Sequence, residues 1–326
     1  MVLYLCTALS IDDLNELKRL EGLLDTSATT FLTMTAQAVD DMVGNDLVAV
    51  TRAAVNVFAG DATNPVLVSF DFDMSGIVAT LTMTFSETVD ASTVDVTQLT
   101  LQSSGSGAAE SFTLTGGTAS VDDSTVMSVD VTHDDLNAIK ALTQLATLST
   151  NTYLSIGSGL IADMNGNAVV AIAPTSGLVV TTFVADVTAP ELVAFDLDMD
   201  SGVMTLSFSE TVLASSLAPI RFTLDNAACA TASYTLTGGT TSTVDSDVLT
   251  IALTIADLNN IKYETSLATA TGNTYVSVTA QGVHDMAAVP NAVVARASCT
   301  NNLGVTTFVA DTTAPVLVSF DLNMEL

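Results

Sequence analysis

Tryptophan is absent from the 326-residue chain, and aromatic residues make up only 5 % of it. Flat stacking platforms for bases or sugars are therefore scarce. Basic residues are few as well, since 7 Lys and Arg stand against 36 Asp and Glu, for a formal net charge of −29. A field of that sign repels phosphate backbones and anionic headgroups, so we expect no nucleic-acid partner and no peripheral membrane role.

The chain also has little of what catalytic sites need. Its three cysteines fit neither a disulfide-rich scaffold nor a cysteine-rich zinc protein. Neither of its two histidines, His133 and His284, recurs at a repeated position with a Ser, Cys or acid beside it. No Asn-x-Ser/Thr acceptor is present, which leaves O-linked sugar on outward Ser and Thr as the possible glycan. We therefore expect no enzyme and no cofactor, with calcium as the one possible metal.

An internal repeat dominates what is present. The triplet at 13–15, Asp-Leu-Asn, recurs 122 residues later at 135–137 and again at 257–259. Linker residues recur at a spacing of 125, each Asp followed four residues later by a Pro, at Asp61/Pro65, Asp186/Pro190 and Asp311/Pro315. A fixed period of this kind is typical of tandem repeats.

The phase of the repeat predicts the domain organisation. Residues 1–60 correspond to the C-terminal half of a repeat, 61–185 and 186–310 to complete repeats, and 311–326 to the first strand of a further repeat. We expect the chain to begin and end inside a domain. The uncharged run 167–185 is interrupted by Pro and Gly, and no membrane span is expected.

Within a repeat the apolar residues alternate with a period of two. Residues 80–85, Thr-Leu-Thr-Met-Thr-Phe, and 204–208, Met-Thr-Leu-Ser-Phe, show the pattern of half-buried strands. One short helix is expected at 134–140, after two acids that suit a helix N-terminus. Many short strands at this length predict an all-β fold of tandem immunoglobulin-like antiparallel β-sandwiches.

Four segments carry a family resemblance: Ala-Pro…Phe-Asp-Leu-Asp-Met at 189–199, Leu-Ser-Phe-Ser-Glu-Thr-Val at 206–212, Asn-Thr-Tyr at 151–153 and Asp-Met-Asn-Gly-Asn at 163–167. Together they resemble the bacterial Ig-like repeats of surface-layer and adhesin type, which also occur in large surface proteins of aquatic microbes and algae. The resemblance implies this fold and an extracellular or cell-surface structural role without catalytic residues. The segment 285–288, Asp-Met-Ala-Ala, departs from it because it lacks the Gly-Asn.

Calcium is the metal that the acidic residues suit best, because calcium prefers oxygen ligands at alternate positions of a loop. The alternative is that these acids are solvated and keep an apolar protein soluble. The candidate ligands are Asp163, Asn165, Asn167, Asp196, Asp198 and Asp200.

Lysines and cysteines suggest structural cross-links. The lysines 18, 140 and 262 occupy one repeated position, and we expect the recurring acids to pair with them, Glu87 with Lys140 and Glu210 with Lys262. An exposed pair that stabilises little is the alternative. Cys229 and Cys299 lie in loops of the same repeat and are expected to form a disulfide, which fits an oxidising compartment.

The incomplete repeats predict the function. Strands expected at 1–9, 30–34 and 55–58 present an apolar face whose covering strands are missing. We therefore expect copies of the chain to assemble head to tail into an extracellular filament or surface array by strand complementation. The alternatives are a longer tandem chain and an adhesin-type binding module. The expected interface residues are Pro315, Val316, Leu317, Val318, Phe320, Leu3, Leu5 and Leu9.

Overall fold

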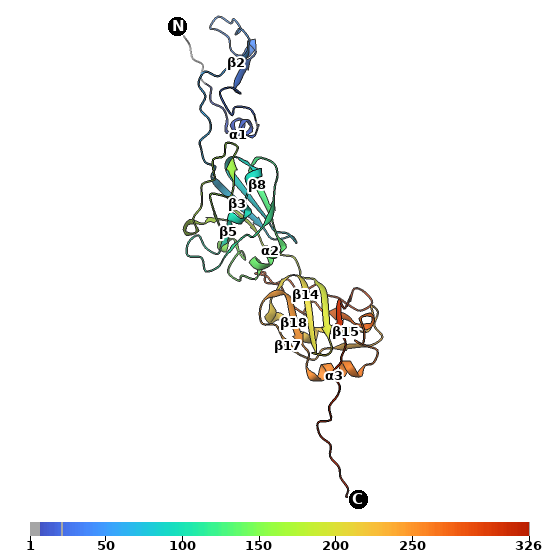
Figure 1. Ribbon diagram of the computed structural model, residues 1–326. Coiled ribbons are helices and arrows are strands. Elements are labelled where there is room, and N and C mark those ends of the chain that lie inside the picture. Colours follow the sequence, from blue (N-terminus) through green and yellow to red (C-terminus); the bar gives the residue numbers. More distant parts are fainter. Residues whose placement is uncertain (1–6, 21, 326) are drawn as a thin grey trace. The chain divides into compact units, whose positions relative to one another are not determined.

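The computed structural model describes residues 7–20 and 22–325 and divides into two compact units, Met1–Asp186 and Val187–Leu326 (Figure 1). The division falls one residue after the boundary that the repeat predicts. The fold is all-β: its many short strands are accompanied, in the described part of the chain, by three short α-helices. None of these helices is long and apolar enough to cross a membrane. The helices are α1 (Ile11–Arg19), α2 (His133–Lys140) and α3 (Ile255–Tyr263).

The first unit contains a large sheet of order β12-β3-β4-β8-β7, in which β10 also pairs with β4, and a smaller sheet of order β11-β9-β5-β6. The large sheet consists of β3 (Leu67–Asp73), β4 (Thr80–Asp90), β7 (Gly117–Ala119), β8 (Ser124–Val131), β10 (Ala162–Asp163) and β12 (Thr182–Val184). The smaller sheet consists of β5 (Leu99–Gln102), β6 (Ser111–Thr113), β9 (Tyr153–Ile156) and β11 (Leu178–Val179).

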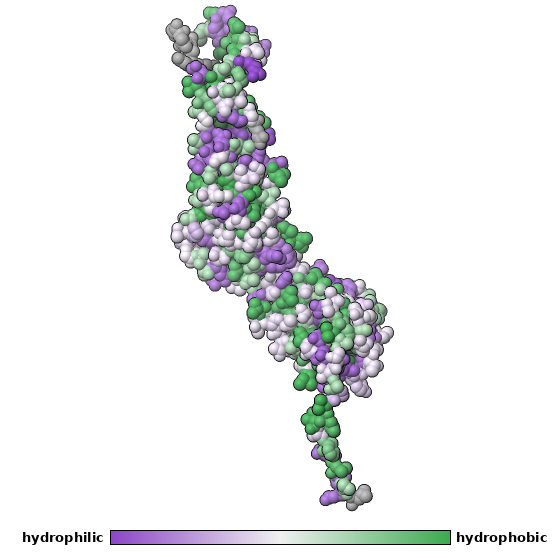
Figure 2. All heavy atoms as spheres, viewed as in Figure 1, coloured by the Kyte–Doolittle hydropathy of each residue, from purple (hydrophilic) through white to green (hydrophobic). Residues whose placement is uncertain are grey.

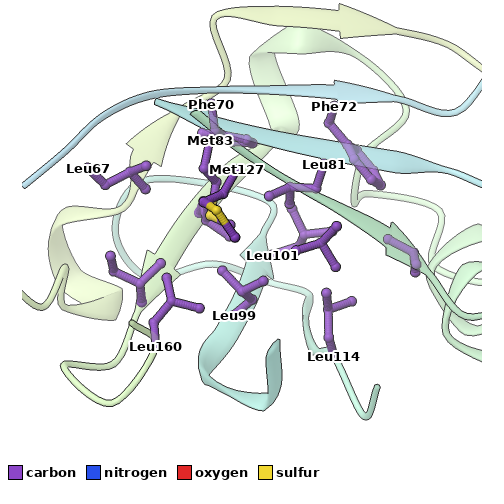
Figure 3. Close-up of a cluster of buried hydrophobic side chains, with 14 of the residues drawn as sticks. Leu67, Phe70, Phe72, Leu81, Met83, Leu99, Leu101, Leu114, Met127 and Leu160 are labelled. Atoms are coloured by element: carbon purple, nitrogen blue, oxygen red, sulfur yellow. The ribbon is translucent and has the colours of Figure 1, made fainter. Parts of the chain in front are cut away.

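The two sheets of this unit share one hydrophobic core. Alternation along β4 buries Leu81, Met83 and Phe85, while the threonines between them stay half-buried. Leu99 and Leu101 of β5 belong to the same cluster (Figure 3). Two sheets around one core are compatible with a β-sandwich, and the Ig-like type stays a prediction.

The second unit has the same strand order, except that an isolated bridge between Val212 and Asp285 takes the place of the pairing of β10 with β4. Its larger sheet runs β17-β18-β14-β13-β21 and its smaller sheet β16-β15-β19-β20, around a core of its own. The strands of the larger sheet are β13 (Leu192–Asp198), β14 (Val203–Val212), β17 (Thr240–Thr241), β18 (Ser246–Ala252) and β21 (Thr307–Val309). Those of the smaller sheet are β15 (Phe222–Asp225), β16 (Ser233–Thr235), β19 (Tyr275–Val278) and β20 (Leu303–Gly304).

One pairing in each unit is parallel, so the expectation of purely antiparallel sheets is wrong. β12 lies parallel to β3, and β21 lies parallel to β13. The last strand of a repeat thus runs beside the first strand in the same direction, which is possible because more than a hundred residues connect them. Each repeat is closed by its own first and last strands.

The described residues of 7–60 form the helix α1, a small sheet and one turn of 3-10 helix at Ala36–Ala38. In that sheet β1 (Phe31–Met34) pairs with β2 (Val50–Ala54) in the manner in which β9 pairs with β11. The expected strands at 1–9 and 55–58 do not form in the described residues: 7–10 and 55–58 are in no strand, and 1–6 lie outside the described part. In the first complete repeat the strands at the corresponding positions are β8 and β12, which pair with β4 and β3. No described strand lies beside residues 7–60 in the positions of β4 and β3.

Cys229 and Cys299 form the expected disulfide. The amide of Cys299 also donates to the carbonyl of Ala228 at 2.7 Å. In the first repeat the corresponding bond runs from the Gly177 amide to the Gly105 carbonyl at 2.8 Å, without a covalent link. The second repeat therefore has a cross-link between two loops that the first repeat holds together with hydrogen bonds.

We expect reduction of this disulfide to lower the free energy of unfolding of the second repeat by about 4 kcal/mol, because the bond closes a loop of 70 residues in the unfolded chain. Native-state hydrogen exchange with and without reductant measures this change in β14 and β18. The strands β4 and β8 of the first repeat serve as the internal control. Equal changes in both repeats would contradict the assignment.

Candidate functional site

Residues 7–60 leave apolar side chains in solvent that complete repeats bury. Leu32 is 59 % exposed, whereas its counterparts Leu154 and Val276 are 0 % exposed. Three more side chains are exposed although their counterparts in the first complete repeat are buried, and with Leu32 they form what we call the half-repeat surface: Leu14, Leu23, Leu32 and Val39. No residue in the described part of 7–60 is buried. An apolar surface of this kind is typical of an interface.

A buried aspartate of the complete repeats shows the same incompleteness. Asp257 accepts hydrogen bonds from the Thr237 hydroxyl at 2.7 Å and the Tyr234 hydroxyl at 2.8 Å. Burial opposes the charge of Asp257, but these hydrogen bonds outweigh it and lower its pKa. The counterpart Asp13 is exposed and bonds only within its own helix end, to Ser10. No described loop lies beside Asp13 in the position that the loop of Thr237 occupies beside Asp257.

The second exposed surface is the C-terminal tail, residues 312–325, which is extended and belongs to no sheet (Figures 1 and 2). Hydrophobic side chains follow one another along it, and all the expected interface residues of this segment are exposed. Of the expected residues near the N-terminus, Leu9 is exposed and in no strand, while Leu3 and Leu5 lie outside the described residues.

Lys18 connects the half-repeat to the first complete repeat. Its Nζ lies 2.7 Å from Asp61 Oδ2 in the linker and also donates to Glu87 Oε2 on β4. The Thr88 hydroxyl donates to the Asn15 carbonyl of the same helix at 2.9 Å. A strand of one repeat therefore holds the helix of the preceding one.

The expected pairing of the recurring glutamates with the lysines is wrong. Glu87 pairs with Lys18, not with Lys140, and Lys140 pairs with Asp186 at 2.9 Å. Lys262 pairs with Asp311, also at 2.9 Å. Every lysine at this position thus bonds the Asp of the linker that follows it. The repeated linker aspartates were visible in the sequence and would have revealed this pairing. The fourth residue of the expected pairs, Glu210, lies buried on β14.

Charge and burial act in opposite directions at this junction. Burial disfavours the charged forms of Lys18 and Asp61, but the hydrogen bonds between them prevail, so the pKa of Lys18 is raised and that of Asp61 lowered. For Glu87 burial prevails and raises the pKa, although Lys18 works against this. The result is a charged Lys–Asp pair beside a carboxyl group that protonates readily.

The expected calcium ligands are engaged by the protein itself. Asp163 accepts from the amides of Asn165 and Asn167 at 2.9 and 2.8 Å and closes its own hairpin. In the second unit Asp198 accepts from the amide of Asp200 at 2.8 Å in a tight turn. Asp196 accepts from the Thr307 amide and Asp200 from the Thr312 and Thr313 amides.

The first three of these residues belong to one unit and the last three to the other. Within the described residues of the first unit, the only cluster of carboxylates that could hold a cation is Asp61, Glu87 and Asp163. The Lys18 ammonium group already contacts two of its members. The geometry therefore favours the structural role of these acids over the calcium role.

We expect Lys18→Ala to lower the free energy for opening α1 by about 2 kcal/mol, between the values for exposed and buried ion pairs. The loss leaves Asp61 and Glu87 facing each other without a cation. Hydrogen exchange of the α1 amides measures the change. The matched control is Arg19→Ala on the same helix, whose partner Glu16 is exposed, so that its loss should have a much smaller effect. Equal effects of the two variants would contradict the conclusion that Lys18 holds α1 through Asp61 and Glu87.

Glu87 should give the first unit a recognisable pH dependence. Because its folded-state pKa is raised, the folded state binds a proton that the unfolded chain has released. Its contribution to stability therefore falls as the pH rises from the ordinary value of 4.5 through the raised pKa. Glu87→Gln should remove this slope from urea-unfolding midpoints, and Glu325→Gln in the exposed tail should not. A slope that survives Glu87→Gln would contradict the assignment to this carboxyl group, which faces Lys18, Asp61 and Asp163.

Comparison with known proteins gives no relative from which a role could be transferred. No protein-family model matches the chain, and no curated protein matches it. The resemblance to Ig-like surface repeats stays an expectation from the sequence. The function is therefore argued from the two exposed surfaces and the internal repeat.

Proposed function

We propose that this protein is a structural protomer of an extracellular filament or surface array, in which copies join head to tail by strand complementation. The C-terminal tail of one copy takes the place of a first strand on the half-repeat surface of the next copy. The two surfaces differ from each other, so the contact is heterologous, and it builds open chains wherever the rotation between copies does not close a ring.

The observation that carries the proposal is that the tail repeats the sequence of β3. Residues 315–321, Pro-Val-Leu-Val-Ser-Phe-Asp, are identical to residues 65–71. Leu317 and Phe320 are 79 % and 77 % exposed, while their counterparts Leu67 and Phe70 are 4 % and 1 % exposed. The tail is therefore a first strand without its sheet, and burying its two large side chains favours docking by about 3–6 kcal/mol.

Three further features support an extracellular structural role. The disulfide persists in oxidising compartments. The repeats have hydrophobic cores of their own, and their buried polar groups are used in hairpins, caps and ion pairs. The high negative charge keeps single chains apart and makes the assembly dependent on salt, because added ions screen the repulsion.

We expect Leu317→Asp to reduce self-association at least tenfold, because it places a charge at a position that β3 buries. Sedimentation velocity over a concentration series, with negative-stain microscopy of the same samples, measures the effect. All proteins in the series carry Cys6→Ser, so that intermolecular disulfides do not contribute.

The control is Asn323→Asp. Its counterpart on β3 is already an exposed aspartate, Asp73, so a charge at residue 323 should leave assembly nearly unchanged. Equal loss in both variants would show that charge alone is responsible. A parent protein that stays monomeric over the whole soluble range, also at high salt, would contradict the proposed function.

A further inference from the structure

A cavity of about 380 Å³ opens beside α1 and the linker in the first unit. Its lining is mostly apolar, and part of the half-repeat surface belongs to it. The apolar residues that line it are Leu14, Leu17, Leu23, Leu24, Phe58 and Ala59. The charged end of Lys18 and its partner Asp61 form the polar rim.

The complete repeats show what occupies this place. In the second unit Met199, just after β13, lines a smaller cavity of about 250 Å³ together with Leu267, Ala268 and Phe308. By the register of the repeat, the last three residues correspond to Leu23, Leu24 and Phe58. The cavity beside α1 therefore has no side chain at the position that Met199 occupies in the second unit.

We infer that the cavity beside Phe58 is a socket for Met324 of a second copy of the chain. Met324 corresponds to Met74 and Met199, which are 3 % and 2 % exposed, whereas Met324 is 85 % exposed. An unbranched thioether side chain fills irregular apolar gaps well. The inference rests on the proposed function and names the contact that anchors the donated strand.

The socket is already formed in the half-repeat. Leu24 adopts the left-handed backbone conformation with φ 64°, and its counterparts Ala146 and Ala268 have φ 52° and 51°. This conformation is uncommon for residues other than glycine. Its presence in all three copies means that the backbone at this point of the socket wall has the conformation found in complete repeats. Little ordering is then required for docking.

Backbone contacts that recur in both complete repeats define the register of the donated strand. The Met74 amide donates to the Val184 carbonyl at 2.9 Å, and the Met199 amide donates to the Val309 carbonyl at 2.9 Å. The corresponding bond joins the Met324 amide of one copy to the Ala59 carbonyl of the other. The strand then lies parallel to residues 57–59.

Asp321 provides a hydrogen bond that is specific to this register. In the first repeat the Thr182 amide donates to Asp71 Oδ1 at 2.8 Å, and in the second the Thr307 amide donates to Asp196 Oδ1 at 2.8 Å. Asp321 is the third copy of this aspartate, and the amide of Val57 is in the position of the donor. A shift of one residue would break this bond and withdraw Met324 from the socket.

A peptide of residues 312–325 with a fluorescent label tests the socket. The receiver is the full chain with Leu317→Asp and Cys6→Ser, whose own tail no longer competes. Fluorescence anisotropy measures the affinity. We expect Met324→Ala in the peptide, and Leu23→Glu in the receiver, each to weaken binding at least tenfold. The controls are Asn323→Asp in the peptide, whose counterpart Asp73 is exposed on β3, and Val48→Glu in the receiver, whose counterparts Val170 and Val294 stay exposed in complete repeats. Each control should change binding less than threefold.

The results separate the Met324 socket from strand complementation in general. Loss of binding in both socket variants, with the controls intact, supports the socket. Full binding of the Met324→Ala peptide overturns the socket but leaves strand complementation standing, because that rests on Leu317 and Phe320. If full chains assemble while the parent peptide does not bind, the docking site is overturned. If full chains do not assemble either, the proposed function fails.

Discussion

The parallel pairing of the first and last strands of each repeat is the constraint on which the remaining structure depends. β3 meets β12, and β13 meets β21, across more than a hundred residues of chain. A repeat can therefore bury its core only when both of its ends are present. The described residues of 7–60 and of the tail leave apolar side chains exposed that complete repeats bury. The complementarity that we propose between these segments uses the same pairing.

The lysine junction adds a second, electrostatic connection between repeats. Lys18 belongs to the helix of one repeat, Asp61 to the linker and Glu87 to a strand of the next. A charge pair of this kind is directional and excludes other partners more than it adds stability. The chain has only 7 basic residues, and three of them are the lysines at this repeated position. The apolar cores stabilise the repeats, and each lysine binds the aspartate of the linker that follows its helix.

The sequence predicted much of this structure because its repeats supply internal comparisons. The all-β class, the helix at 134–140 and the Cys229–Cys299 disulfide follow from alternation, acids at a helix start and cysteines confined to one repeat. The parallel strand pair was missed, because alternation reports which face is buried and not the direction of a neighbour. The repeat spacing shows which lysines and acids recur but not which of the recurring acids, on the strand or in the linker, lies within reach of each lysine. The socket depends on which side chain fills a gap, which periodicity alone does not reveal.

The direction of the donated strand has a consequence for the whole assembly. If the tail enters parallel to residues 57–59, the joint between copies reproduces the pairing that closes each repeat within a chain. Every copy then points the same way, and the assembly is polar, with one half-repeat surface and one tail left at its two ends. The uniform negative charge opposes side-by-side association of such chains, whereas the joint itself buries apolar side chains and is less affected. The same two properties of the sequence, its repeat and its charge, therefore favour end-to-end growth over aggregation.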